Sequence, residues 1–155
     1  MNKEFQLVQT QDLPITLEEA WGFFSNPKNL ARITPPSLGF VVTSQPPEDI
    51  SEGLTITYTV KPLFGVPVKW VSLIREVQEP YQFVDQQLKG PYAHWHHLHR
   101  FTKILGGVRV EDKVTYALPM GFLGVMVHPF LVTPRLKEIF EFRRITLINH
   151  FGEIA

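Results

Sequence analysis

Between Phe40 and Leu118, polar and apolar side chains alternate along the sequence, and short turn sequences interrupt the alternation. In residues 55–60, for example, threonines alternate with Ile56, Tyr58 and Val60. Successive side chains of a strand point to opposite faces, so the pattern predicts strands with one polar and one apolar face. Strands joined by short turns pair as antiparallel hairpins. We therefore expect a meander of about six strands whose apolar face is buried.

Helical patterns flank this meander. Residues 4–10 alternate and predict a first strand, after which Thr16 and Glu19 match a capping box at the start of a helix. A second short helix is expected over residues 27–33, and a long helix over residues 134–150 with a proline in its first turn. A curved antiparallel sheet with helices on one face is an α+β arrangement.

Size and charge exclude several classes of protein. The 155 residues suit one domain spanning 1–155, and 15 basic and 15 acidic side chains balance at a pI near 7.0. This balance argues against nucleic acid or an anionic membrane as the main partner. The absence of cysteine excludes disulfides and thiolate metal sites. Without a signal-peptide core or an apolar run of roughly twenty residues, we expect a soluble cytoplasmic protein.

The apolar face also carries a row of polar groups. Folding each hairpin about its turn, including one at residues 64–66, predicts which residues lie opposite one another. The expected neighbours are Val60 and Trp70, Tyr58 and Ser72, Ser72 and Asp85, Ile74 and Phe83, Asp85 and His97, Phe83 and His99, and either His99 or Phe101 with Asp112. Burying unpaired polar groups costs several kcal/mol each. These groups therefore either satisfy one another or line a wet cavity.

A set of short motifs is spread over most of the chain. They are Gly-Val-Pro-Val-Lys-Trp at 65–70, Phe-Val-Asp-Gln at 83–86, Gly-Pro-Tyr at 90–92, Trp-His-His-Leu-His-Arg-Phe at 95–101, Asp-Lys-Val-Thr-Tyr at 112–116 and Ile-Phe-Glu-Phe-Arg-Arg at 139–144. With the element order, they resemble a bacterial branch of the START, pollen-allergen and polyketide-cyclase superfamily (SRPBCC). The resemblance implies a helix-grip fold, in which a seven-stranded curved antiparallel sheet wraps around the long C-terminal helix. It also implies a hydrophobic cavity between them that holds lipids, polyketides or other apolar molecules.

The predicted ligand site combines the inner face of the sheet with one side of the C-terminal helix. Its expected apolar walls are Ile56, Tyr58, Trp70, Ile74, Phe83, Trp95, Phe101, Val114, Tyr116, Leu136 and Phe140. The polar groups expected to orient a ligand are Asp85, His97, His99 and Asp112. Arg143 of the helix either holds an anionic head group or forms a salt bridge to the sheet. The first hypothesis is a carrier or sensor of a small apolar or amphipathic molecule, without a cofactor.

Other readings of the same residues stay open. Asp112 and His99 could form the acid–base pair of a cyclase or dehydratase. The inward histidines and aspartates could bind zinc, although no known ligand spacing is present and no metal is predicted. In a structural reading, His97 and His99 hydrogen-bond the two aspartates, with His99 as the partner of Asp112. Phe142 and Ile145 fall outside the cavity face and could contact a second copy or a partner protein. Residues 118–134 form a buried connector, a short helix, a mobile lid or a lip that touches a membrane.

Overall fold

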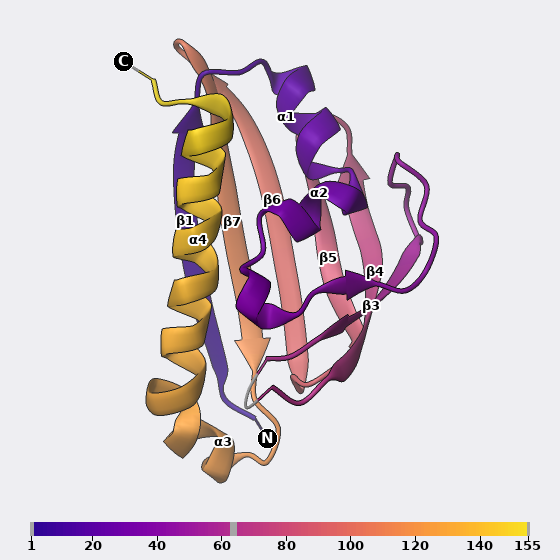
Figure 1. Cartoon of the computed structure of the whole chain (residues 1–155), viewed down its shortest axis with the longest axis vertical. Helices are drawn as coiled ribbons and strands as arrows, with labels where there is room; N and C mark the ends of the chain where they lie inside the picture. Colours follow the sequence, from indigo (N-terminus) through magenta and orange to yellow (C-terminus); the bar gives the residue numbers. More distant parts are fainter. Residues whose placement is uncertain (1, 63–64, 155) are drawn as a thin grey trace.

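Seven strands form one antiparallel sheet in the computed structural model, which describes residues 2–62 and 65–154 (Figure 1). The strands are β1 (Glu4–Leu13), β2 (Val41–Val42), β3 (Thr55–Val60), β4 (Val68–Gln78), β5 (Gln82–Lys89), β6 (His94–Ile104) and β7 (Gly107–Ala117). Their order in the sheet is β1-β7-β6-β5-β4-β3-β2. Strands β2 to β7 are thus a meander, as the alternation predicts, and β1 joins it beside β7.

The helices lie together on one face of the sheet. They are α1 (Leu17–Phe24), α2 (Pro27–Arg32), the 3₁₀ turn η1 (Pro36–Leu38), α3 (Phe122–Val127), the π-helical turn η2 (His128–Val132) and α4 (Thr133–Phe151). In Figure 1, α4 runs along the β1–β7 side of the sheet, and α1 and α2 cover its middle. The chain therefore has the α+β helix-grip fold.

Local sequence explains where α1 begins and which side of α4 is buried. The backbone N–H of Glu19 donates to Thr16 Oγ1 at 3.0 Å, and the N–H of Thr16 donates to Glu19 Oε1, which confirms the capping box. The buried residues of α4 recur at helical spacing: Leu136, Phe140, Arg143 and Leu147. On its other side Ile145 is exposed and Phe142 half-buried, so the expected partner surface there stays a prediction.

Strand register agrees with expectation in one half of the sheet. Asp85 lies opposite His97, and His99 lies opposite both Phe83 and Asp112, as the Gly90-Pro91 and Gly106-Gly107 turns predict. The other two hairpins are shifted by two residues from the prediction. Tyr58 lies opposite Trp70, and Ile74 lies opposite Asp85.

Both shifts have a local cause. Between β4 and β5 the register is interrupted at Arg75–Gln78, where Glu76 adopts a φ of 52°. This irregularity changes the register by only one residue, between the pairs Gln78–Gln82 and Arg75–Val84. The shift from the prediction arises in the turn, which is centred on residue 80, whereas the predicted pairs require a centre between residues 78 and 79. Val60 pairs with Val68, so the connection between β3 and β4 is centred on residue 64. The predicted turn at 64–66 is centred on residue 65, one position later. Residues 63 and 64 of that turn lie outside the described residues.

Gly107 is expected to be essential for the pairing of β1 with β7. A Cβ at this position would overlap the backbone carbonyl oxygen of Leu13. Moving this oxygen away would break hydrogen bonds between β1 and β7. We expect Gly107→Ala to lower the free energy of unfolding in urea by about 1–3 kcal/mol. Gly22 on the exposed side of α1 has open space around it, so Gly22→Ala should raise stability by up to about 1 kcal/mol. Equal effects of the two substitutions would contradict this explanation.

Candidate functional site

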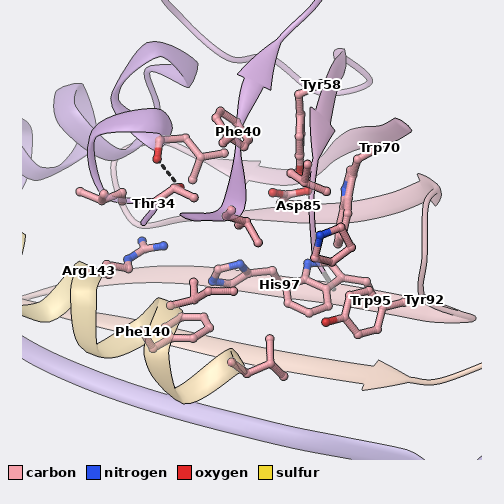
Figure 2. A pocket seen from close by; sticks show the side chains of 17 residues that line it. Thr34, Phe40, Tyr58, Trp70, Asp85, Tyr92, Trp95, His97, Phe140 and Arg143 are labelled. Carbon is pink, nitrogen blue, oxygen red and sulfur yellow. Dashed lines mark hydrogen bonds between the residues drawn. The ribbon is translucent and has the colours of Figure 1, made fainter. Parts of the chain in front are cut away.

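An inner cavity of about 110 Å³ lies between the sheet, α4 and the segment that leads from α2 to β2. Its walls are Leu30, Ile33, Thr34, Leu38, Phe40, Tyr58, Val60, Pro62, Trp70, Asp85, Tyr92, Trp95, His97, Leu136, Ile139, Phe140 and Arg143. Figure 2 shows Arg143 at one side of this space, His97 in its middle, and Asp85 beside Tyr58 and Trp70, with Trp95 and Tyr92 at the end away from Arg143. The cavity is therefore mostly aromatic and aliphatic, with a few placed polar groups.

A smaller pocket of about 40 Å³ continues from the inner cavity under α2. The two spaces share Leu30, Phe40, Tyr58 and Asp85 in their walls. The small pocket is also lined by His99, Phe83 and Ser72, among other residues. Asp85 thus lies at the boundary between the two spaces.

A larger outer cavity of about 520 Å³ adjoins the other end of the inner one. Leu38, Pro62, Tyr92 and Ile139 belong to the walls of both. The remaining walls come mainly from residues 118–127 at the start of the C-terminal helical region. Residues 118–134 contain the short helix α3, as one reading predicts. Many side chains of this segment are exposed, so it is not a buried connector. Its exposed apolar side chains are Met120, Phe122, Leu123, Met126, Val127 and Phe130.

Most residues predicted for the ligand site lie together around these spaces. In the walls of the inner cavity or the small pocket are Ile56, Tyr58, Trp70, Ile74, Phe83, Asp85, Trp95, His97, His99, Leu136, Phe140 and Arg143. Phe101, Asp112, Val114 and Tyr116 are not part of these walls.

These four residues are displaced from the cavity because neighbouring elements cover them. Phe101 packs against Trp21 and Phe24 of α1, with ring centroids 6.1 and 5.4 Å apart. Val114 is fully buried in the core. Tyr116 is hydrogen-bonded through its hydroxyl to His128 Nε2 at 2.6 Å. Asp112 lies behind two residues that do line the cavity.

Residues 30–40 provide one side of the cavity that was not predicted from the sequence. Leu30, Ile33 and Thr34 follow one another at helical spacing around the end of α2, and Phe40 precedes β2. That spacing was the available signal, because it predicts one apolar side on a short helix. Tyr92 was also missed, although it belongs to the Gly-Pro-Tyr motif.

Asp112 is the centre of a buried ionic cluster. Its Oδ1 lies 2.8 Å from His97 Nε2, 3.1 Å from Arg143 Nη2 and 3.5 Å from His99 Nδ1. Of the two histidines, only His97 contacts Asp112 with hydrogen-bond geometry. The expectation that His99 is the hydrogen-bond partner of Asp112 is thus corrected. The ring of His99 instead stacks between Phe83 and His97, with centroid distances of 4.3 and 3.8 Å.

The charge of this cluster follows from its contacts. Burial raises the pKa of Asp112, but Arg143 and the hydrogen bond from His97 together lower it below its ordinary value. Asp112 is therefore ionised and accepts a hydrogen bond that His97 Nε2 donates. Arg143 forms the salt bridge to the sheet that one alternative predicts. Its positive charge is balanced by Asp112 within the cluster.

Trp70, Ser72 and Tyr58 form a second polar group, and they hydrogen-bond one another. Trp70 Nε1 donates to Ser72 Oγ at 3.1 Å, and the hydroxyl of Tyr58 lies 3.2 Å from the same oxygen. These three residues come from the facing strands β3 and β4. They need no further partner to be buried.

Asp85 and His99 differ, because each has a buried side-chain atom without a hydrogen-bond partner. Asp85 Oδ1 and both ring nitrogens of His99 have no hydrogen-bond partner among the described residues, and the same holds for Arg143 Nε. Burial raises the pKa of the Asp85 carboxyl above its ordinary value. Burial, and then the proximity of His97 and Arg143, holds the pKa of His99 well below its ordinary value. His99 is therefore neutral, and the polar groups around the cavity have unused hydrogen-bonding capacity.

Comparisons with known proteins support the fold. No protein-family model matches the sequence, and no curated protein matches it. Among solved structures, it is similar to protein Ms6760 from Mycobacterium smegmatis, with 18% identity and a TM-score of 0.68 over 94% of this chain and 89% of that chain. TTHA0849 from Thermus thermophilus has 12% identity and a TM-score of 0.68, covering 96% and 99% of the two chains. Ara h 8.0201 has 14% identity and a TM-score of 0.59, covering 95% and 99%.

At these identities, the solved structures show a shared fold. The chain has their helix-grip fold, as the resemblance implies. This fold is typical of proteins that bind ligands, and it also includes cyclases. In residues 2–62 and 65–154, no helix is long and apolar enough to span a membrane.

Proposed function

We propose that residues 1–155 act as one ligand-binding domain that carries or senses a small, mainly apolar molecule with one polar group. The molecule binds in the inner cavity, with its polar group beside Asp85 or Arg143. The observation that carries this proposal is the set of buried polar atoms without partners in the wall of an otherwise apolar space. Each such atom costs about 1–3 kcal/mol, and a ligand that hydrogen-bonds them recovers part of this cost.

The walls and the volume of about 110 Å³ support a small aromatic ligand, or the aromatic end of a larger one such as a polyketide. Trp70, Trp95, Tyr92 and Phe140 offer ring faces and edges, and aromatic rings prefer such contacts with one another. Arg143 donates hydrogen bonds in this cavity, and the carboxyl of Asp85 accepts them. A ligand oxygen, as in a carboxylate, carbonyl or hydroxyl group, fits beside Arg143.

The outer cavity supports a route of entry. It shares four wall residues with the inner cavity and is bordered by exposed apolar side chains of α3. Ile139 lies between the two spaces, where one larger side chain would obstruct passage.

A carrier role is favoured over a cyclase that uses Asp112 and His99. An acid–base catalyst must reach the reacting atom of its substrate. Asp112 lies outside the cavity walls and is occupied by His97 and Arg143, which weighs against that pair.

The test combines identification of a bound molecule with obstruction of its path. Native mass spectrometry of the purified protein is expected to show one bound apolar molecule, which extraction then identifies. Quenching of tryptophan fluorescence by 2-naphthoic acid should report binding near Trp70 and Trp95. We expect Ile139→Trp to weaken this binding at least tenfold, whereas Lys137→Trp, on the exposed side of α4, should not change it. An empty protein that binds the probe equally well in both variants would refute the proposal.

A further inference from the structure

Asp85, His97 and His99 bring three potential metal ligands together inside the sheet. Asp85 of β5 lies directly opposite His97 of β6, and His99 follows two residues later on the same face. One donor atom of each residue lies within 4.8 Å of the others. Two imidazoles and one carboxylate are a ligand set that divalent transition metals such as zinc accept.

Three side-chain atoms of this cluster have no hydrogen-bond partner among the described residues: Asp85 Oδ1 and the two ring nitrogens of His99. His99 is only 5% exposed, and Asp85 Oδ1 is likewise buried. Buried polar groups are hydrogen-bonded in the great majority of cases, so this combination requires an explanation. An imidazole nitrogen without a hydrogen-bond partner can offer its lone pair to a metal ion.

His97 has the hydrogen bond that metal-bound histidines typically have. Its Nε2 donates to Asp112 Oδ1 at 2.8 Å, which leaves Nδ1 as the nitrogen for a metal. A carboxylate behind a histidine ligand fixes its tautomer and raises its basicity. Asp112 is itself held by Arg143, and the charges of these two residues cancel close to the site.

We propose that Asp85, His97 and His99 bind a divalent transition-metal ion such as zinc, with an open coordination position toward the inner cavity. The rings of His97 and His99 stack at 3.8 Å with an angle of 22° between their planes, and a metal ion lies in the plane of each imidazole that binds it. Metal binding with ligand bonds of about 2.1 Å therefore requires at least one of the two rings to rotate out of this stack. Asp85 and His97 line the inner cavity, so the open position faces the space that a cavity ligand would occupy. The site does not depend on an organic ligand, and its failure would leave the proposed function standing.

The test uses the full chain and Zn²⁺ or Co²⁺ alone. After dialysis against a chelator, calorimetric titration with Zn²⁺ is expected to show one site per chain, and Zn²⁺ should raise the melting temperature. Asp85→Asn and His99→Gln should each weaken Zn²⁺ binding at least a hundredfold. His94→Gln and His96→Gln are matched controls on the outward face of the same strand, and both should bind like the unmodified protein.

The controls also identify binding at the wrong place. His94 lies 3.6 Å from Glu4, and His96 lies 3.7 Å from Glu76, so each outer pair could attract a metal ion. Loss of binding in His94→Gln or His96→Gln, or its retention in Asp85→Asn, would overturn the proposal. X-ray absorption of the Zn²⁺-loaded unmodified chain adds a readout that needs no variant. Two imidazole nitrogens at about 2.0–2.1 Å are expected, and a shell of oxygens alone would overturn the proposal.

Discussion

Replacing Asp112 by alanine is expected to lower the free energy of unfolding by about 3–5 kcal/mol, because it leaves the buried Arg143 charge without a counterion. Asp112 is 3% exposed, and its Oδ1 contacts both Arg143 and His97. In a domain of this size, each kcal/mol corresponds to a shift of the melting temperature of roughly 2–4 °C. Urea unfolding followed by tryptophan fluorescence measures the effect.

A compensating substitution separates charge from packing. The pair Asp112→Leu with Arg143→Met removes both charges and keeps apolar volume, so we expect it to recover most of the stability lost in Asp112→Ala. The coupling between the two positions should then exceed about 1 kcal/mol in a double-mutant cycle. A small loss in Asp112→Ala, below about 1 kcal/mol, would show that Arg143 finds another partner or reaches solvent.

Phe101→Ala is expected to cost about 3–5 kcal/mol through the cavity that it leaves. Phe101 is 1% exposed and packs against Trp21, Phe24 and Phe83. Because it lies outside the walls of the inner cavity, the variant should bind 2-naphthoic acid with unchanged affinity under conditions where it stays folded.

Phe122→Ala is the matched control for this prediction. Phe122 is 76% exposed on α3, so its truncation should change stability by no more than about 0.5 kcal/mol. A stable Phe101→Ala variant with altered probe affinity would instead assign Phe101 to the binding site, as the sequence analysis expected.

The polar row predicted from the sequence divides into groups with different roles. Tyr58, Trp70 and Ser72 satisfy one another, and His97 and Arg143 satisfy Asp112. Asp85 and His99 retain free donors or acceptors. Stability alone does not require free polar atoms in a core, and natural proteins tend to accept such costs where a site needs them. Both proposals concern these residues for that reason.

The division could not be read from the alternation. A period of two assigns each side chain to a face, and for the residues of β5, β6 and β7 that assignment was sufficient to place Asp85, His97 and His99 near one another. It does not specify side-chain rotamers. His99 lies opposite Asp112 in the ladder, yet its ring stacks on Phe83 and leaves Asp112 to His97.

Features that depend on neighbours along the chain could be predicted from the sequence. The capping box starts α1, tight turns set the register of β5, β6 and β7, and alternation separates the buried face from the exposed one. Features that depend on residues far apart in the sequence became clear only in the tertiary structure. The pairing of β4 with β5 placed Ile74 opposite Asp85, α1 covered Phe101, and residues 30–40 closed the cavity over the sheet. These outcomes depend on how separate elements pack together, and packing energy is a property of the pair rather than of either segment.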